Sequence, residues 1–250
     1  MGYDGLMTQA TTIFHVYDRD TEAVERALTE VFAREGRPSV LRLQGTFSAV
    51  LAKAVDIDLS ANYRYLLCRP HADSKWTPLL ELGTRTDGLD VELSRQLDGA
   101  PVFTVFVYGD AVSGYRLARG GNEMDRYSSD PTYFITDEEA ERPDYEAERG
   151  HPERFADLLP GDTDAADFVR VVLRPGWWED FEATTGYAVN SPASSDAEEG
   201  DEEDLVDEVD RMRCIALALE LWGPAEYPFG QELEEIPNKD VGPGIVLAFE

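Results

Sequence analysis

The sequence contains little lysine and carries few positive charges of any kind. Lysine occurs only at positions 53, 75 and 239, and arginine supplies the rest of the 22 basic residues. They stand against 51 aspartate and glutamate residues, which gives a formal net charge of -29. Such a chain has no stripe of cations with which to neutralise phosphates, so we expect no binding to nucleic acid.

The excess of carboxylates resembles the composition of proteins from salt-accumulating halophilic archaea. In such proteins the acidic side chains keep the surface hydrated, while concentrated salt screens their mutual repulsion. A net charge of this origin reports on the solvent more than on function. The other interpretation, a surface that attracts a basic partner, stays open.

Cysteine and histidine are also scarce. Cys68 and Cys214 lie far apart and neither belongs to a Cys-x-x-Cys pair, so we expect buried thiols in a reducing cytoplasm. The three histidines, His15, His71 and His151, fall in separate segments without the spacing of metal ligands. The sequence therefore predicts no metal site and no cofactor.

Long apolar runs are absent as well. No stretch approaches the ~18 uninterrupted apolar residues of a membrane-spanning helix. The start, "MGYDGLMTQATT", has neither the basic residues nor the apolar run of a signal peptide, and translation begins at Met1 or at Met7. We therefore expect a cytoplasmic protein without a membrane anchor.

Residues 10–134 show an alternation of strand and helix patterns. "TIFHVYDRD" alternates with a period of two, and "TEAVERALTEVFAREG" places apolar residues on one helical stripe after Asp20 or Thr21. Strand patterns follow in "SVLRLQGTFSAVLAKAV", with Gly45 as a bend or bulge, and in "YRYLLCR" and "WTPLLELG", and then a helix in "DGLDVELSRQL", capped by Asp87. "PVFTVFVYGD", "VSGYRLARG" and "NEMDRYS" predict an antiparallel meander with glycine-containing turns.

The second half has a different pattern. Residues 135–150 form a charged boundary segment, and residues 151–250 are predicted to be mostly helical, with a short helix in "HPERFADLLPG" and a last strand in "GIVLAFE". An acidic linker, residues 191–204, divides them. The expected class is α+β, a largely antiparallel sheet with helices on one face, followed by a smaller mostly helical region.

Polar and aromatic side chains on the meander and the strand before it are the candidate site. Carboxylates pair with cations and tyrosines offer stacking faces, so such a group suits a sugar, an amine or a basic side chain. The other interpretation is a turn aspartate beside ordinary cross-strand pairs. The candidate binding residues are Trp76, Asp110, Tyr115, Arg116, Asp125 and Tyr127.

Signatures of covalent or nucleotide chemistry are missing. "GDAVSGY" has the wrong spacing for a nucleophile elbow, and no phosphate-binding loop occurs. His71 and Asp73 stand close together in "RPHADSKW", a spacing of low specificity. Paired carboxylates of a hydrolase need only come together in space, so 51 acidic residues leave that alternative open.

Residues 74–223 resemble a broad group of uncharacterised bacterial and archaeal proteins. The resemblance rests on "SKWTPLLELG", "DGLDVELSRQL", the meander through "SSDPTYF", "HPERFADLLPG" and "RMRCIALALELWG". The matching positions are Trp76, Leu93, Ser94, Tyr115, Gly120, Asp125, Tyr127, Ser129, Pro131 and Phe134. The group has no assigned activity, so the resemblance implies a fold and leaves function open.

Taken together, the sequence favours a non-enzymatic interaction or regulatory protein that binds another protein. The alternative is a carboxylate-dependent hydrolase with a site near Asp110 and Asp125. The two hypotheses differ in whether these carboxylates meet in a concave pocket with shifted pKa values or spread over a convex face.

Overall fold

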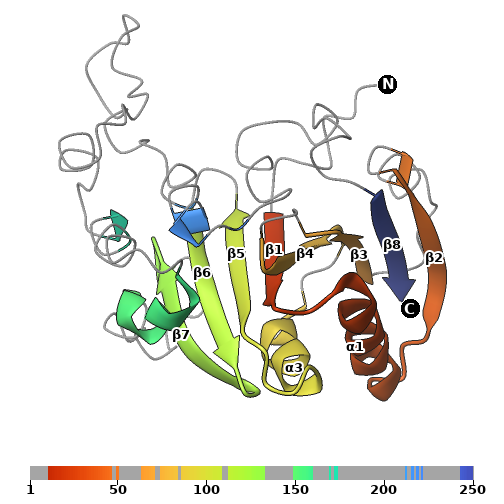
Figure 1. Ribbon diagram of the computed structural model, residues 1–250, viewed down its shortest axis with the longest axis horizontal. Helices are drawn as coiled ribbons and strands as arrows, with labels where there is room; N and C mark the ends of the chain where they lie inside the picture. Colours follow the sequence, from red (N-terminus) through yellow and green to blue (C-terminus); the bar gives the residue numbers. More distant parts are fainter. Residues whose placement is uncertain are drawn as a thin grey trace, which may run out of the picture.

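A computed structural model of the protein describes most of the first half of the chain and shorter pieces of the second half (Figure 1). The described residues are 11–46, 49–50, 63–70, 74–83, 86–108, 112–132, 149–159, 169, 172–173, 212, 215–216, 218–219, 221 and 243–249. Asp110, the acidic linker and most of residues 133–242 lie outside them.

The described residues form one sheet of eight strands, and every neighbouring pair is antiparallel. The order across the sheet is β2-β8-β3-β4-β1-β5-β6-β7. The predicted α+β class with a largely antiparallel sheet is confirmed. The strands are β1 (Thr11–Tyr17), β2 (Ser39–Thr46), β3 (Tyr63–Cys68), β4 (Trp76–Glu81), β5 (Val102–Tyr108), β6 (Val112–Arg119), β7 (Asn122–Ser128) and β8 (Pro243–Phe249).

The meander of β5, β6 and β7 forms as predicted. The turn from β6 to β7 passes through Gly120 and Gly121, whose φ angles are 62° and 73°. These left-handed conformations suit a two-residue hairpin turn, because they match the twist of the flanking strands and cost glycine little.

The last strand, β8, lies in the interior of the sheet, between β2 and β3 (Figure 1). "GIVLAFE" was predicted as a strand, and its successive buried apolar residues fit a strand covered on both faces of the sheet. Strand β2 joins the described sheet only through β8. The two ends of the chain therefore contribute to one sheet.

Two helices cover one face of the sheet (Figure 1). Helix α1 (Thr21–Arg34) begins after Asp20, whose carboxylate accepts the backbone N–H of Ala23 at 2.7 Å. Helix α3 (Leu89–Gln96) begins after Gly88, which has a φ of 75° and no side-chain cap. The predicted cap at Asp87 is wrong, because the left-handed backbone of Gly88 turns the chain into the helix.

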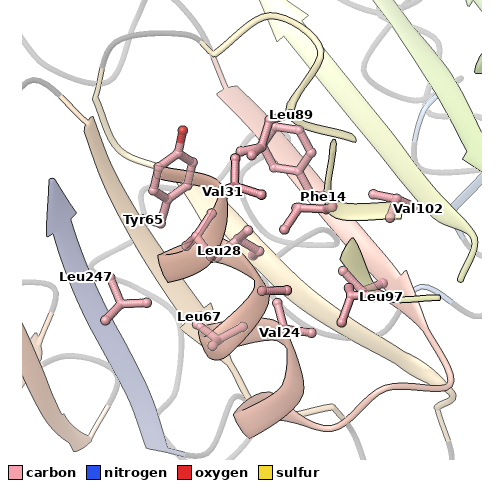
Figure 2. Packing of buried hydrophobic residues seen from close by; sticks show 14 of the residues in the cluster. Phe14, Val24, Leu28, Val31, Tyr65, Leu67, Leu89, Leu97, Val102 and Leu247 are labelled. Atoms are coloured by element: carbon pink, nitrogen blue, oxygen red, sulfur yellow. The ribbon is translucent and has the colours of Figure 1, made fainter. Parts of the chain in front are cut away.

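The core beneath these helices, here the helix-side core, is built mainly of aliphatic residues (Figure 2). Leu28 and Val31 of α1 point towards Phe14, Tyr65 and their neighbours on the strands. Phe32 stacks on Phe249 with ring centroids 4.4 Å apart. The contact ties α1 to β8 and so fixes the last strand beneath the first helix.

A second core lies on the opposite face and is called the far-side core. The sheet contributes Phe103, Tyr115 and Tyr127, and the later part of the chain contributes Phe155, Val172, Ile215 and Leu219 among others. Both faces of the sheet are therefore covered by other parts of the chain.

The segment at 151–159 differs from its predicted short helix. It forms two single 3-10 turns, η1 (Pro152–Arg154) and η2 (Ala156–Leu158), with bonds from the N–H of Phe155 to the carbonyl of Pro152 and from Leu158 to Phe155. The predicted inward residues Phe155, Leu158 and Leu159 are buried.

The division into two halves stays a prediction. In the described part, no helix is both long and apolar enough to cross a membrane.

His15 is fully buried on the far side of β1, between Pro78 of β4 and Phe103 of β5. Neither ring nitrogen has a hydrogen-bond partner of good geometry. Burial lowers the pKa of His15 to about 3, against a smaller opposing effect of the Phe103 backbone. The ring is therefore neutral wherever the protein is folded at moderate pH.

We expect His15 to make folding weaker in acid. Between pH 6.5 and about 3 the unfolded chain binds a proton that the folded chain refuses, so stability falls as the pH drops. The limiting slope is about 1.4 kcal/mol per pH unit. Urea unfolding of wild type and His15→Leu at several pH values should give curves that are parallel above pH 6.5 and diverge below it. Curves parallel throughout would contradict a neutral buried ring.

Candidate functional site

The best-connected polar group of the described structure is the carboxylate of Asp125 on β7. Its side chain is fully buried. Oδ2 accepts the Tyr115 hydroxyl and the backbone N–H of His151, each at 2.8 Å. Oδ1 lies 3.2 Å from Nδ1 of His151 and 3.4 Å from Nη1 of Arg154. Four groups from three residues therefore converge on one carboxylate, here called the Asp125 cluster.

Cross-strand pairing explains why Tyr115 reaches this carboxylate. Tyr115 on β6 stands opposite Tyr127 on β7, and Asp125 is two residues away, so all three side chains share one face. Gly150 lies against the hydroxyl: an added Cβ would be 2.5 Å from Tyr115 Oη, and its φ is 74°. Glycine at 150 thus allows the backbone before His151 to pass over the tyrosine.

The residues from 149 to 159 are held against the sheet by this cluster and by aromatic packing. Arg149 forms a β-bridge with Tyr127 on the outer side of β7. Phe155 is fully buried and makes edge-to-face contacts with Phe103 and Tyr115, at centroid distances of 5.6 and 5.7 Å. The cluster therefore attaches residues 149–159 to β7.

Electrostatics at the cluster follow from burial. Burial raises the pKa of Asp125, and the His151 N–H, the Tyr115 hydroxyl and the His151 ring oppose this only in part. Burial and the neighbouring Asp125 charge raise the pKa of Tyr115 well above its ordinary value, so the hydroxyl remains a donor. Since the folded state raises the pKa of Asp125, this carboxyl stabilises the fold below its unfolded pKa of 3.8, and the contribution is lost as the pH rises through the folded pKa.

Chemically, the arrangement offers an aspartate bound to Nδ1 of a histidine. Such a partner holds the ring in one orientation and tautomer and leaves Nε2 for proton transfer. The His151 side chain is 15% exposed and so lies near the surface. The described residues contain no group of three or more histidine, cysteine or acidic residues that could hold a metal ion.

The structure brings together three of the six predicted site residues: Tyr115, Asp125 and Tyr127. Trp76 lies on the same face, where its Nε1 donates to the carbonyl of Leu219 at 2.9 Å and its ring meets Tyr17 edge to face. All four are buried, with exposures between 0 and 6%. Their role in binding stays a prediction, and Asp110 lies outside the described residues.

Arg116 is separated from this group because it points to the opposite face. Its Nε lies 3.4 Å from Oδ2 of Asp90 on α3, and the Asp90 side chain is only 1% exposed. Neither carboxylate oxygen has a hydrogen-bond partner, nor has the hydroxyl of Thr104, which stands opposite Arg116. This pair is a buried ionic contact beneath α3, with little hydrogen bonding to support it.

Residues that the sequence did not single out form the exposed rim of the cluster: Met124, His151 and Arg154, here called the β7 rim. Met124 is 42% exposed, and its carbonyl accepts a bond from Arg154 Nη1 at 3.0 Å. The Arg154 side chain is 45% exposed. His151 lies 26 residues from Asp125, and no spacing rule connects two residues so far apart.

Comparison with known proteins gives no match. No family model matches the sequence, no curated protein matches it, and no solved structure matches the fold. The arguments for a function therefore rest on the residues and contacts of this chain.

We expect Asp125→Asn to destabilise the fold more than Tyr115→Phe. The asparagine amide presents an NH2 group to donors that need an acceptor, a cost of about 3 kcal/mol, whereas loss of the tyrosine hydroxyl costs about 1–2 kcal/mol. Urea unfolding measures both values. Because the two residues are bonded, their double mutant should cost less than the sum of the single mutants.

Tyr17→Phe is the matched control for these substitutions. Tyr17 lies on the same face and contacts Trp76 and Lys75 through its ring, which phenylalanine retains. Its effect should be well below that of Tyr115→Phe. Additive effects of Tyr115→Phe and Asp125→Asn would show that the hydroxyl and the carboxylate act separately.

Proposed function

We propose that this chain is a non-enzymatic interaction or regulatory protein that binds another protein through the β7 rim. The observation that supports this most is the position of Met124. Among the described residues two large apolar side chains are exposed, Val40 and Met124, and they lie on the two outermost strands. Met124 stands beside the half-exposed guanidinium of Arg154, and both residue types are enriched in protein interfaces.

The Asp125 cluster supplies the rigidity that such a surface needs. Asp125 is the immediate neighbour of Met124, and its carboxylate is bonded to the backbone of His151 and lies beside Arg154. A rim whose backbone is already ordered loses less conformational entropy on binding. The buried residues Tyr115 and Tyr127 then support the surface from beneath.

The cellular setting is part of the proposal. Given 51 acidic residues and a net charge of -29, we propose a cytoplasm with concentrated salt. Under such conditions charge attraction is screened, so apolar and hydrogen-bonding contacts become the main source of affinity. The β7 rim offers both kinds.

Affinity capture of the tagged protein from its own cells in concentrated salt should yield a stoichiometric protein partner. Met124→Lys should weaken binding of the purified partner at least tenfold, which corresponds to about 1.4 kcal/mol. Met124→Leu should bind nearly as wild type. Equal binding by wild type and Met124→Lys in a titration calorimeter would remove the rim from the proposal.

The alternative, a carboxylate-dependent hydrolase near Asp110 and Asp125, is favoured by one contact. Asp125 Oδ1 lies 3.2 Å from Nδ1 of His151, the arrangement that orients a histidine as general base. Against it, the Asp125 side chain is fully buried and already holds four partners.

We expect no saturable hydrolysis of p-nitrophenyl esters or phosphates by the purified wild type. The same assay on His151→Gln, Asp110→Asn and Asp125→Asn decides between the functions. A saturable activity that disappears in a folded His151→Gln variant would establish the hydrolase and displace the interaction hypothesis. Unfolding midpoints of the variants separate loss of activity from loss of fold.

A further inference from the structure

Strand β2 is the outermost strand on the side of the sheet opposite β7 (Figure 1). It pairs with β8 along one side, and no strand of the described chain pairs with its other side. The register is regular from Leu41 to Thr46, after a single irregularity between Ser39 and Leu41. Six consecutive residues therefore present a regular outer edge, which is a template for another strand.

The side chains of β2 leave apolar surface partly uncovered. Val40 is 49% exposed. Leu41 and Leu43 are only partly buried, where they pack on a small cluster that includes Ile13, Leu66, Leu80 and Val246. A further strand beside β2 would complete the burial of these two leucines.

Charge distinguishes β2 from β7, the other outermost strand, which contains Glu123 and Asp125. About one residue in five is acidic overall, 51 of 250, yet Ser39–Thr46 contains no aspartate or glutamate. Its single charged residue, Arg42, binds both oxygens of Glu25 on α1, at 2.5 and 3.0 Å. The charge of Arg42 is thus compensated, and the edge is close to neutral.

An edge of this kind suits a second copy of the same chain. A contact between two molecules of net charge -29 removes water from carboxylates wherever acidic surfaces meet, a cost that salt does not abolish, and β2 is a segment at which two copies can meet without acids. Antiparallel pairing of a strand with itself is self-complementary about a two-fold axis, so one edge serves both partners. The outer side of β7 is less suited, because Arg149 and Arg154 already bond to its backbone.

We infer that the protein forms a dimer in which β2 pairs antiparallel with β2 of a second copy, joining the two sheets. Leu41 and Leu43 of one chain then cover those of the other. The dimer is independent of the partner surface at the β7 rim.

Sedimentation velocity over a concentration series should show a species of twice the chain mass of 27.9 kDa. Gln44→Glu should weaken association at least tenfold, because it adds a carboxylate to each copy of an edge that contains none. The loss should shrink at about 1 M salt, where the screening length falls to ~3 Å. Gln44→Asn, which adds no charge, should dimerise as wild type does.

Single cysteines at Val40, Gln44 and Thr46 test direct contact. Under mild oxidation the variant whose cysteine lies nearest the two-fold axis should form a disulfide-linked dimer. Wild type, oxidised in the same way, shows how much crosslinking the native cysteines Cys68 and Cys214 cause. A monomer at every concentration would overturn the inference, as would a dimer that Gln44→Glu and Gln44→Asn weaken equally, or one without a crosslink on β2.

The outcome is separable from that of the proposed function. A monomer that still binds its captured partner removes the dimer and leaves the β7 rim intact. A β2 dimer for which no partner is captured supports the dimer and removes the partner surface at the β7 rim. Unfolding midpoints of all variants, measured in the same salt, show whether a loss of association reflects a loss of fold.

Discussion

Burial of both faces of the sheet is the constraint on which the rest of this structure depends. Helices α1 and α3 cover one face, and residues from the second half of the chain cover the other. Six consecutive residues of β5 are buried, so the side chains on both faces of this strand lie in a core. Any polar group on these strands must then find a partner inside the protein, since water does not reach it.

The polar residues of the sheet meet this constraint to different degrees. Asp125 meets it fully, because two hydrogen bonds to one oxygen and two close cationic or ring contacts to the other surround its carboxylate. The ring nitrogens of His15 have no hydrogen-bond partner of good geometry, and the ring avoids the larger cost of a buried charge by remaining neutral, whereas Asp90 relies on a single arginine. Buried polar networks specify one arrangement of the chain when they are satisfied. The Asp125 cluster therefore selects one docking position for residues 149–159.

Local pattern predicted much of the fold because strands and helices here follow their expected periods. The strands of the meander, α1 and β8 could all be read from short windows of sequence. The place of β8 between β2 and β3 could not, because no local signal encodes pairing between segments so distant. The candidate site was half predictable. Strand alternation puts Tyr115 and Arg116 on opposite faces, which already argues against one site containing both, whereas the convergence of His151 and Arg154 on Asp125 depends on tertiary contacts alone.

The position of β8 also shapes how the chain emerges from the ribosome. Strand β2 is synthesised early, but the strand that attaches it to the sheet follows after roughly 200 residues, an interval of about 10–40 seconds at ordinary rates of synthesis. During that interval the apolar residues of β2 lack β8, the strand with which they pair in the folded protein. The many carboxylates made in the meantime keep the unfinished chain hydrated and soluble, even in salt that screens their mutual repulsion. Acidity would thus protect the protein before it is folded.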